Sequence, residues 1–184
     1  MTLTLLIFNS CDYSKVKTRQ TSVLDTMTVY YNTTRELKNN QIPDSVFQMK
    51  KLRHLAIQGM ECDYGDTKNC WAISEIPKQI NNLKELETLT LNVNAIKTLP
   101  IEIRELHNLK SLDLTDNQGI SDIENIVYLT NLEELALYGC NLEKLPVEIG
   151  KLKKLKHLGI SGNNFEETEI ERIKKALPNC EITF

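Results

Sequence analysis

Apolar residues recur along the middle of the chain at a fixed spacing of 23 residues. The repeated blocks begin at Leu86, Leu109, Leu132 and Leu155. Near the start of each block, two apolar residues flank one polar or small residue, which predicts a short strand with one buried face. A repeat of this length indicates a stack of structural units that bury their apolar faces against one another. The pattern therefore predicts short parallel strands that pair from one unit to the next.

Polar or small residues follow these strands at one position of the repeat: Asn94, Asn117, Cys140 and Asn163. Asparagine side chains at a buried bend can satisfy peptide groups that would otherwise lack hydrogen-bond partners. Cys140 takes this place in its unit, so we expect a buried structural thiol rather than a nucleophile.

A proline begins most of the segments that return from one strand to the next: Pro43, Pro77, Pro100 and Pro146. Its fixed φ and missing N–H are tolerated at such a start. The third regular unit has Ile123 and Glu124 there instead, so we expect its return segment to differ.

The repeat becomes irregular toward both ends. Residues 23–51 are interpreted as a degenerate N-terminal capping repeat, in which Met27, Val29 and Tyr31 alternate like a strand with one buried face. Residues 52–184 contain about five and a half units, with an insertion at 61–72. An apolar stripe predicts a helix at 167–177, and the alternation of residues 180, 182 and 184 predicts a last strand.

These positions resemble the leucine-rich repeat family, whose unit is L-x-x-L-x-L-x-x-N/C-x-L-x-x-L-P-x-x-I-x-x-L. The resemblance extends from about Ile42 to Phe184. The repeated Leu-Pro-x-x-Ile resembles the bacterial and Ras-suppressor-like branch of the family, which has 23-residue repeats. It implies an α/β solenoid, curved into a right-handed superhelix. Parallel strands would line its concave face, short helices or loops its convex face, and a helix and strand would cap the C-terminal end.

The first residues carry a second resemblance. The apolar run that ends in Phe8-Asn9-Ser10-Cys11 resembles the signal of a bacterial lipoprotein, in which Cys11 would be lipidated. Residues 1–22 would then be a signal and a polar tether, and the protein would be anchored outside the cytoplasm at the bacterial envelope. The alternative is a frayed N-terminal strand in a cytoplasmic protein.

Composition and motifs favour a binding protein over an enzyme. The net charge of -3 gives no general attraction to nucleic acid, and contact with a membrane is expected only through a lipid anchor. The sequence contains no Gly-x-Ser-x-Gly or His-Glu-x-x-His motif and no phosphate-binding loop. His54 and His157 lie in separate units, which argues against a shared metal. We therefore expect no enzyme activity, cofactor or metal, and a monomer.

The residues that alternate with the strand leucines point outward and form the default binding surface, since solenoids present an extended concave face. Seven of them are candidate binding residues: Gln58, Asn92, Asp113, Thr115, Glu134, Tyr138 and His157. Tyr138 is the aromatic anchor candidate on this face. Small residues beside it, at 136, 139, 159 and 162, predict a shallow depression.

The insertion at 61–72 is a second candidate for binding. Cys62 and Cys70 could close it with a disulfide outside the reducing cytoplasm, and Tyr64 and Trp71 suit a contact surface. The sequence thus predicts a non-enzymatic scaffold that binds a protein through the concave face, the insertion or both. The alternative is a structural repeat module without a specific partner.

Overall fold

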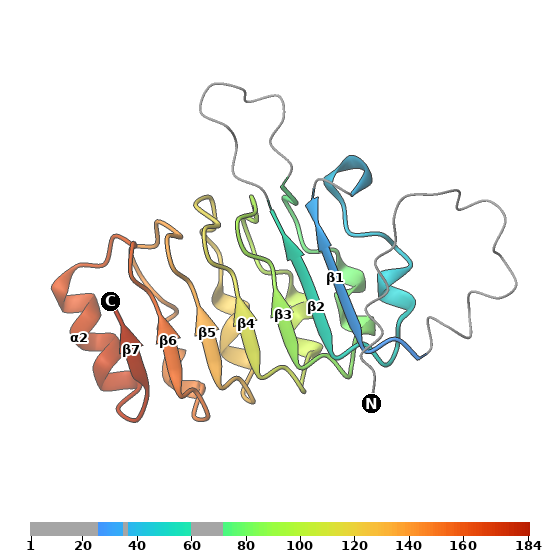
Figure 1. Ribbon diagram of the computed structural model, residues 1–184. Helices are drawn as coiled ribbons and strands as arrows, with labels where there is room; N and C mark the ends of the chain where they lie inside the picture. Colours follow the sequence, from blue (N-terminus) through green and yellow to red (C-terminus); the bar gives the residue numbers. More distant parts are fainter. Residues whose placement is uncertain (1–25, 35–36, 60–71) are drawn as a thin grey trace, which may run out of the picture.

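The computed structural model describes residues 26–34, 37–59 and 72–184. Its strands form one seven-stranded parallel sheet in sequence order, so each unit adds one strand beside the previous one (Figure 1). The strands are β1 (Val29–Thr33), β2 (His54–Gln58), β3 (Thr88–Thr90), β4 (Ser111–Asp113), β5 (Glu134–Ala136), β6 (His157–Gly159) and β7 (Glu181–Thr183). The predicted α/β solenoid is therefore confirmed.

Short helices of the 3-10 type return the chain along the other side of the sheet (Figure 1). They are η2 (Lys38–Asn40), η3 (Val46–Gln48), η4 (Lys78–Asn82), η5 (Ile101–Glu105), η6 (Glu124–Tyr128) and η7 (Ile149–Lys151). Pro77 and Pro100 precede η4 and η5 in extended backbone, with ψ of 146° and 154°. Ile123 precedes η6 with ψ of 16°. The missing proline thus changes the entry to this return segment, but a 3-10 helix still follows.

The core lies between the sheet and the return segments. The central leucines of four neighbouring strands pair directly across the sheet, and each is no more than 2% exposed: Leu89, Leu112, Leu135 and Leu158. Full burial of a leucine side chain stabilises a fold by about 1.5–3 kcal/mol. The same position is also buried at Leu55 and partly buried at Tyr30 and Ile182, so the stabilisation is spread along the solenoid.

Strand β1 presents the opposite face from the one predicted. Tyr30 pairs with Leu55 and packs against the core, whereas Val29 and Tyr31 are 43% and 59% exposed. The prediction that Val29 and Tyr31 are buried is therefore wrong. Apolar residues occupy both faces of this segment, so the alternation alone could not show which face is buried. The pairing with β2 determines which side of the strand meets the core.

Helix α2 (Glu167–Ala176) and strand β7 form the predicted C-terminal cap. Ile173 is fully buried, and Glu169 is 9% exposed. One carboxylate oxygen of Glu169 accepts the backbone N–H of Leu145 at 2.9 Å, and Arg172 donates to both Glu169 oxygens and to the Leu145 carbonyl. This half-buried ion pair joins the helix to the preceding unit.

Candidate functional site: the strand face

The outward side chains of the strands form three columns, which together we call the strand face. The first column contains Val29, His54, Thr88, Ser111, Glu134, His157 and Glu181. The second contains Tyr31, Ala56, Thr90, Asp113, Ala136, Gly159 and Thr183. The strand pairing confirms the predicted alignment of residues 54–159 and adds β1 and β7 to both columns.

The third column continues where the ladder of backbone hydrogen bonds extends past the ends of the strands. It contains Thr33, Gln58, Asn92, Thr115, Tyr138 and Ser161. The backbone N–H of Val93 donates to the carbonyl of Thr115, and the N–H of Asp116 donates to the carbonyl of Tyr138, both at 2.8 Å. These bonds hold candidate binding residues from neighbouring units side by side, although their binding role stays a prediction.

Three asparagines fix the bend at the edge of this face; Asn94 and Asn117 are buried and Asn163 is half-buried. The side-chain nitrogen of Asn117 donates to the carbonyls of Leu91 and Leu114 at 2.9 and 2.8 Å, and its oxygen accepts the N–H of Ile96 at 3.0 Å. Asn94 and Asn163 make the corresponding bonds in their own units. The predicted role of the three asparagines is confirmed.

Cys140 occupies the same position with a thiol. It is fully buried, and its sulfur donates to the Leu114 carbonyl at 3.2 Å. Burial raises the pKa of this thiol to about 11, because a thiolate would lose its hydration. Since the thiolate is the reactive form, Cys140 is a structural thiol, as predicted.

The ring of Tyr138 lies across Gly159. A Cβ built on Gly159 would come within 2.0 Å of the Tyr138 Cζ atom, and Gly159 is itself buried. The expected shallow depression beside Tyr138 is therefore wrong at this point, because the tyrosine fills the space left by the glycine. In the sequence, the presence of Gly159 in an outward column was the signal that a neighbouring aromatic ring could cover this position.

Carboxylates and histidines occupy other parts of the strand face. Asp113 accepts the backbone N–H of Thr115 at 2.9 Å. His157 lies 3.2 Å from a carboxylate oxygen of Glu181, and His54 contacts the hydroxyl of Thr88 at 2.9 Å. The two histidines thus have separate partners in separate parts of the sheet. Among the described residues, no group of three potential ligands is placed to hold a metal ion.

A row of opposite charges lies just before the strands, at the edge of the strand face. Arg53 and Lys110 both pair with Glu87, and Lys156 pairs with Glu133 at 2.5 Å. The bonds from Lys110 and Arg53 lower the pKa of Glu87, and the bond from Lys156 lowers that of Glu133. These cations are therefore engaged by carboxylates of neighbouring units.

Comparison with known proteins identifies the architecture. Residues 23–181 match the family described as leucine-rich repeat region. The chain belongs to the leucine-rich repeat family. Among solved structures, it is 35% identical to a leucine-rich repeat protein of Leptospira interrogans, with a TM-score of 0.67 over 78% of this chain and 34% of that chain.

Two plant proteins are similar to parts of this chain. The ectodomain of the membrane receptor kinase GASSHO1/SCHENGEN3 of Arabidopsis thaliana, solved in complex with CASPARIAN STRIP INTEGRITY FACTOR 2, is 26% identical. Its TM-score is 0.57 over 77% of this chain and 16% of that chain. The receptor-like protein EIX1 of Solanum lycopersicum is 39% identical over 70 residues, which are 37% of this chain and 7% of that protein. This leucine-rich repeat chain thus spans about a third or less of each relative's length.

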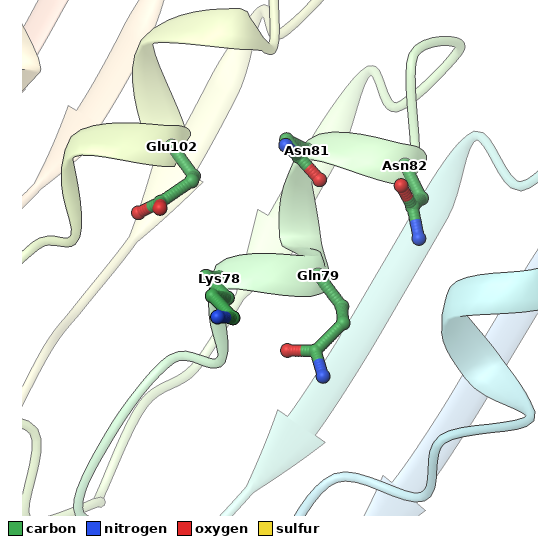
Figure 2. Close-up of a pocket in the computed structure, with 5 residues that line it drawn as sticks. All are labelled: Lys78, Gln79, Asn81, Asn82 and Glu102. Atoms are coloured by element: carbon green, nitrogen blue, oxygen red, sulfur yellow. The ribbon is translucent and has the colours of Figure 1, made fainter.

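The helix side of the leucine-rich repeats has its own surface features, which the sequence did not indicate. A pocket of about 190 Å³ is lined by Lys78, Gln79, Asn81, Asn82 and Glu102 from η4 and η5. Figure 2 shows that the carboxylate of Glu102 points away from the amides of Gln79 and Asn82, so these groups do not converge on one ligand. The large apolar residues Ile101, Tyr128 and Val147 are also exposed on this side.

Several predicted features lie outside the described residues. These are the lipidation of Cys11, the Cys62–Cys70 disulfide, and the contact residues Tyr64 and Trp71 of the insertion. Within the described parts of the chain, no helix is long and apolar enough to cross a membrane.

Proposed function

We propose that this chain is a non-enzymatic recognition module that binds a partner protein through the strand face. Leucine-rich repeat domains generally mediate protein–protein interaction, and the Arabidopsis ectodomain was solved with a bound factor. The observation that carries the proposal is the continuous strand face, which presents three columns of outward side chains across seven parallel strands. Such an extended surface suits a partner that contacts several units at once.

The polar side chains of the strand face support recognition at its centre. Asn92, Thr115 and Tyr138 lie side by side in the third column, and each is half-buried. The amide oxygen of Asn92 is buried and accepts no hydrogen bond from the described residues. Tyrosine combines a large apolar ring with a hydroxyl group and is enriched at interaction hot spots. We therefore place the centre of the interface at these three residues.

Affinity capture with two matched variants tests this proposal. One variant carries Thr115→Arg and Tyr138→Ala on the strand face, and the control carries Ile101→Arg and Tyr128→Ala on the helix side. The proposal expects the wild type and the control to retain the same partner protein, while the strand-face variant loses it. Circular dichroism would confirm that both variants are folded. Equal capture by all three proteins would refute a role of the strand face, and capture of nothing would support a structural module without a partner.

A third variant that lacks residues 61–72 tests the insertion, where Tyr64 and Trp71 supply candidate contacts. We expect weaker capture, because aromatic side chains contribute strongly to protein interfaces. If capture is unchanged, the insertion has no part in binding. Mass analysis before and after reduction would test the Cys62–Cys70 disulfide, which predicts a mass increase of about two hydrogens on reduction.

We also propose that residues 1–22 form a lipoprotein signal and tether that places the repeats outside the cytoplasm. The apolar run before Cys11 supports this proposal. Metabolic labelling with a palmitate analogue should mark the wild type and fail to mark the Cys11→Ala variant. Equal absence of label from both proteins, expressed from the native start, would favour the cytoplasmic alternative.

A further inference from the structure

The described positions of the strand face hold no lysine or arginine. Its three columns hold seven, seven and six described positions, and none of them is a lysine or arginine. The whole chain nevertheless contains 22 such residues. Three positions are carboxylates: Asp113 on β4, Glu134 on β5 and Glu181 on β7. Apart from the histidines His54 and His157, the charged side chains of this face are therefore carboxylates.

The cations near the strand face are already engaged. Arg53 and Lys110 share Glu87, and Lys156 is paired with Glu133 at the edge of the sheet. In contrast, no described residue forms an ion pair with Asp113 or Glu134. Glu134 is exposed, and Lys156, which pairs with Glu133, also attracts it electrostatically. The polar contact that the structure gives Asp113 is the backbone N–H of Thr115. A positively charged partner could thus pair with these two carboxylates without breaking an existing ion pair.

The opposite end of the strand face is apolar. Val29 and Tyr31 on β1 are 43% and 59% exposed, and both belong to the small set of large apolar side chains that are exposed in the described chain. Ala56 lies beside Tyr31 on β2, and the Tyr31 hydroxyl donates to Gln58 at 3.4 Å. The backbone around this ring is held by strand pairing. An apolar side chain of a partner would find a positioned aromatic ring here.

We propose that the strand face binds an extended basic segment of its partner protein, with an apolar side chain on Tyr31 and basic side chains on Asp113 and Glu134. This proposal rests on the proposed function and specifies the chemistry of the partner. Strands lie about 4.8 Å apart, so the Asp113 strand is about 14 Å and the Glu134 strand about 19 Å from the Tyr31 strand. An extended chain advances about 3.3 Å per residue. The basic side chains should therefore follow the apolar one by about four and six residues.

A synthetic peptide with this spacing provides the test. The probe carries, in order, a fluorescent label, leucine, three serines, arginine, serine and arginine, and its counterpart has glutamate in place of both arginines. Fluorescence anisotropy would measure binding to the full chain at low and high salt. One double variant carries Asp113→Asn and Glu134→Gln on the strand face. The control double variant carries Glu124→Gln and Glu148→Gln, which remove the same charge from the helix side.

The wild type and the helix-side control should bind the arginine peptide equally, and the glutamate peptide should not bind. Binding should weaken about tenfold in the Asp113/Glu134 variant, and added salt should weaken it in the wild type. Tyr31→Ala should weaken binding without reducing the dependence on salt. Equal affinity of both charge variants, or no binding of the arginine peptide, would overturn the basic-segment proposal. Capture of an acidic partner through the strand face would overturn it too, while the proposed function would stand.

Discussion

Replacement of Asn117 by alanine tests whether buried side-chain hydrogen bonds hold the repeats together. Asn117 is fully buried. Its side-chain nitrogen donates hydrogen bonds of 2.9 and 2.8 Å to the carbonyls of Leu91 and Leu114, and its side-chain oxygen accepts one of 3.0 Å from the Ile96 N–H. Alanine would leave these three backbone groups without their partner. At about 1 kcal/mol for each bond, plus the cost of burying unpaired groups, the expected loss is about 3–5 kcal/mol.

A loss of this size is a large part of the stability of an ordinary domain, which is about 5–15 kcal/mol. The measurement is urea unfolding followed by far-ultraviolet circular dichroism. With a slope of about 2 kcal/mol/M, a loss of 4 kcal/mol lowers the midpoint by about 2 M. The slope must remain that of the wild type, because a repeat protein can unfold in parts when one unit is weakened.

Asn108→Ala is the matched control, since it makes the same substitution at an exposed site. Asn108 donates one hydrogen bond, to the Lys84 carbonyl at 2.9 Å. Water can replace this bond, so the expected loss is below about 0.5 kcal/mol. Similar losses in the two variants, or a loss below about 1 kcal/mol for Asn117→Ala, would refute the reasoning. Asn117→Cys, which copies the chain's own Cys140, keeps one donor and should be intermediate.

Three further predictions concern other buried contacts. Gly159→Ala should displace the ring of Tyr138, because the added Cβ would lie 2.0 Å from Cζ; faster nitration of Tyr138 would confirm this, and an unchanged rate would contradict it. Arg172 lowers the pKa of Glu169 in the folded protein. The ionised carboxylate therefore stabilises the fold at pH values above its unfolded pKa of about 4.3, and this stabilisation is lost as the pH falls through its lower pKa in the folded protein. The stability difference between wild type and Glu169→Gln should therefore shrink on acidification, and a constant difference from pH 7 to 3 would disprove the assignment. Cys140, with a pKa of about 11, should resist iodoacetamide in the folded protein and react after unfolding, as peptide mass mapping would show; rapid labelling of the native protein would count against its burial.

The sequence alone was sufficient for the architecture because the repeat places chemically equivalent residues at equal intervals. Leu112 and Asn117 could be assigned to a strand and to the following bend, since their counterparts recur one unit earlier. The alignment of Asp113 with Ala136 followed from the same period, because parallel pairing between equal units leaves only one register that buries every leucine. Periodicity thus predicted which residues share the strand face.

The tertiary structure decided the features that depend on contacts between different units. β1 lies outside the regular period, and only its pairing with β2 turns Tyr31 outward and Tyr30 toward the core. The ring of Tyr138 covers Gly159 because the two residues occupy adjacent columns in neighbouring units. Which cations pair with Glu87 likewise depends on side chains from both neighbouring units. A repeat period determines where each residue lies, but the shape and charge of the surface arise from side chains that meet across the sheet.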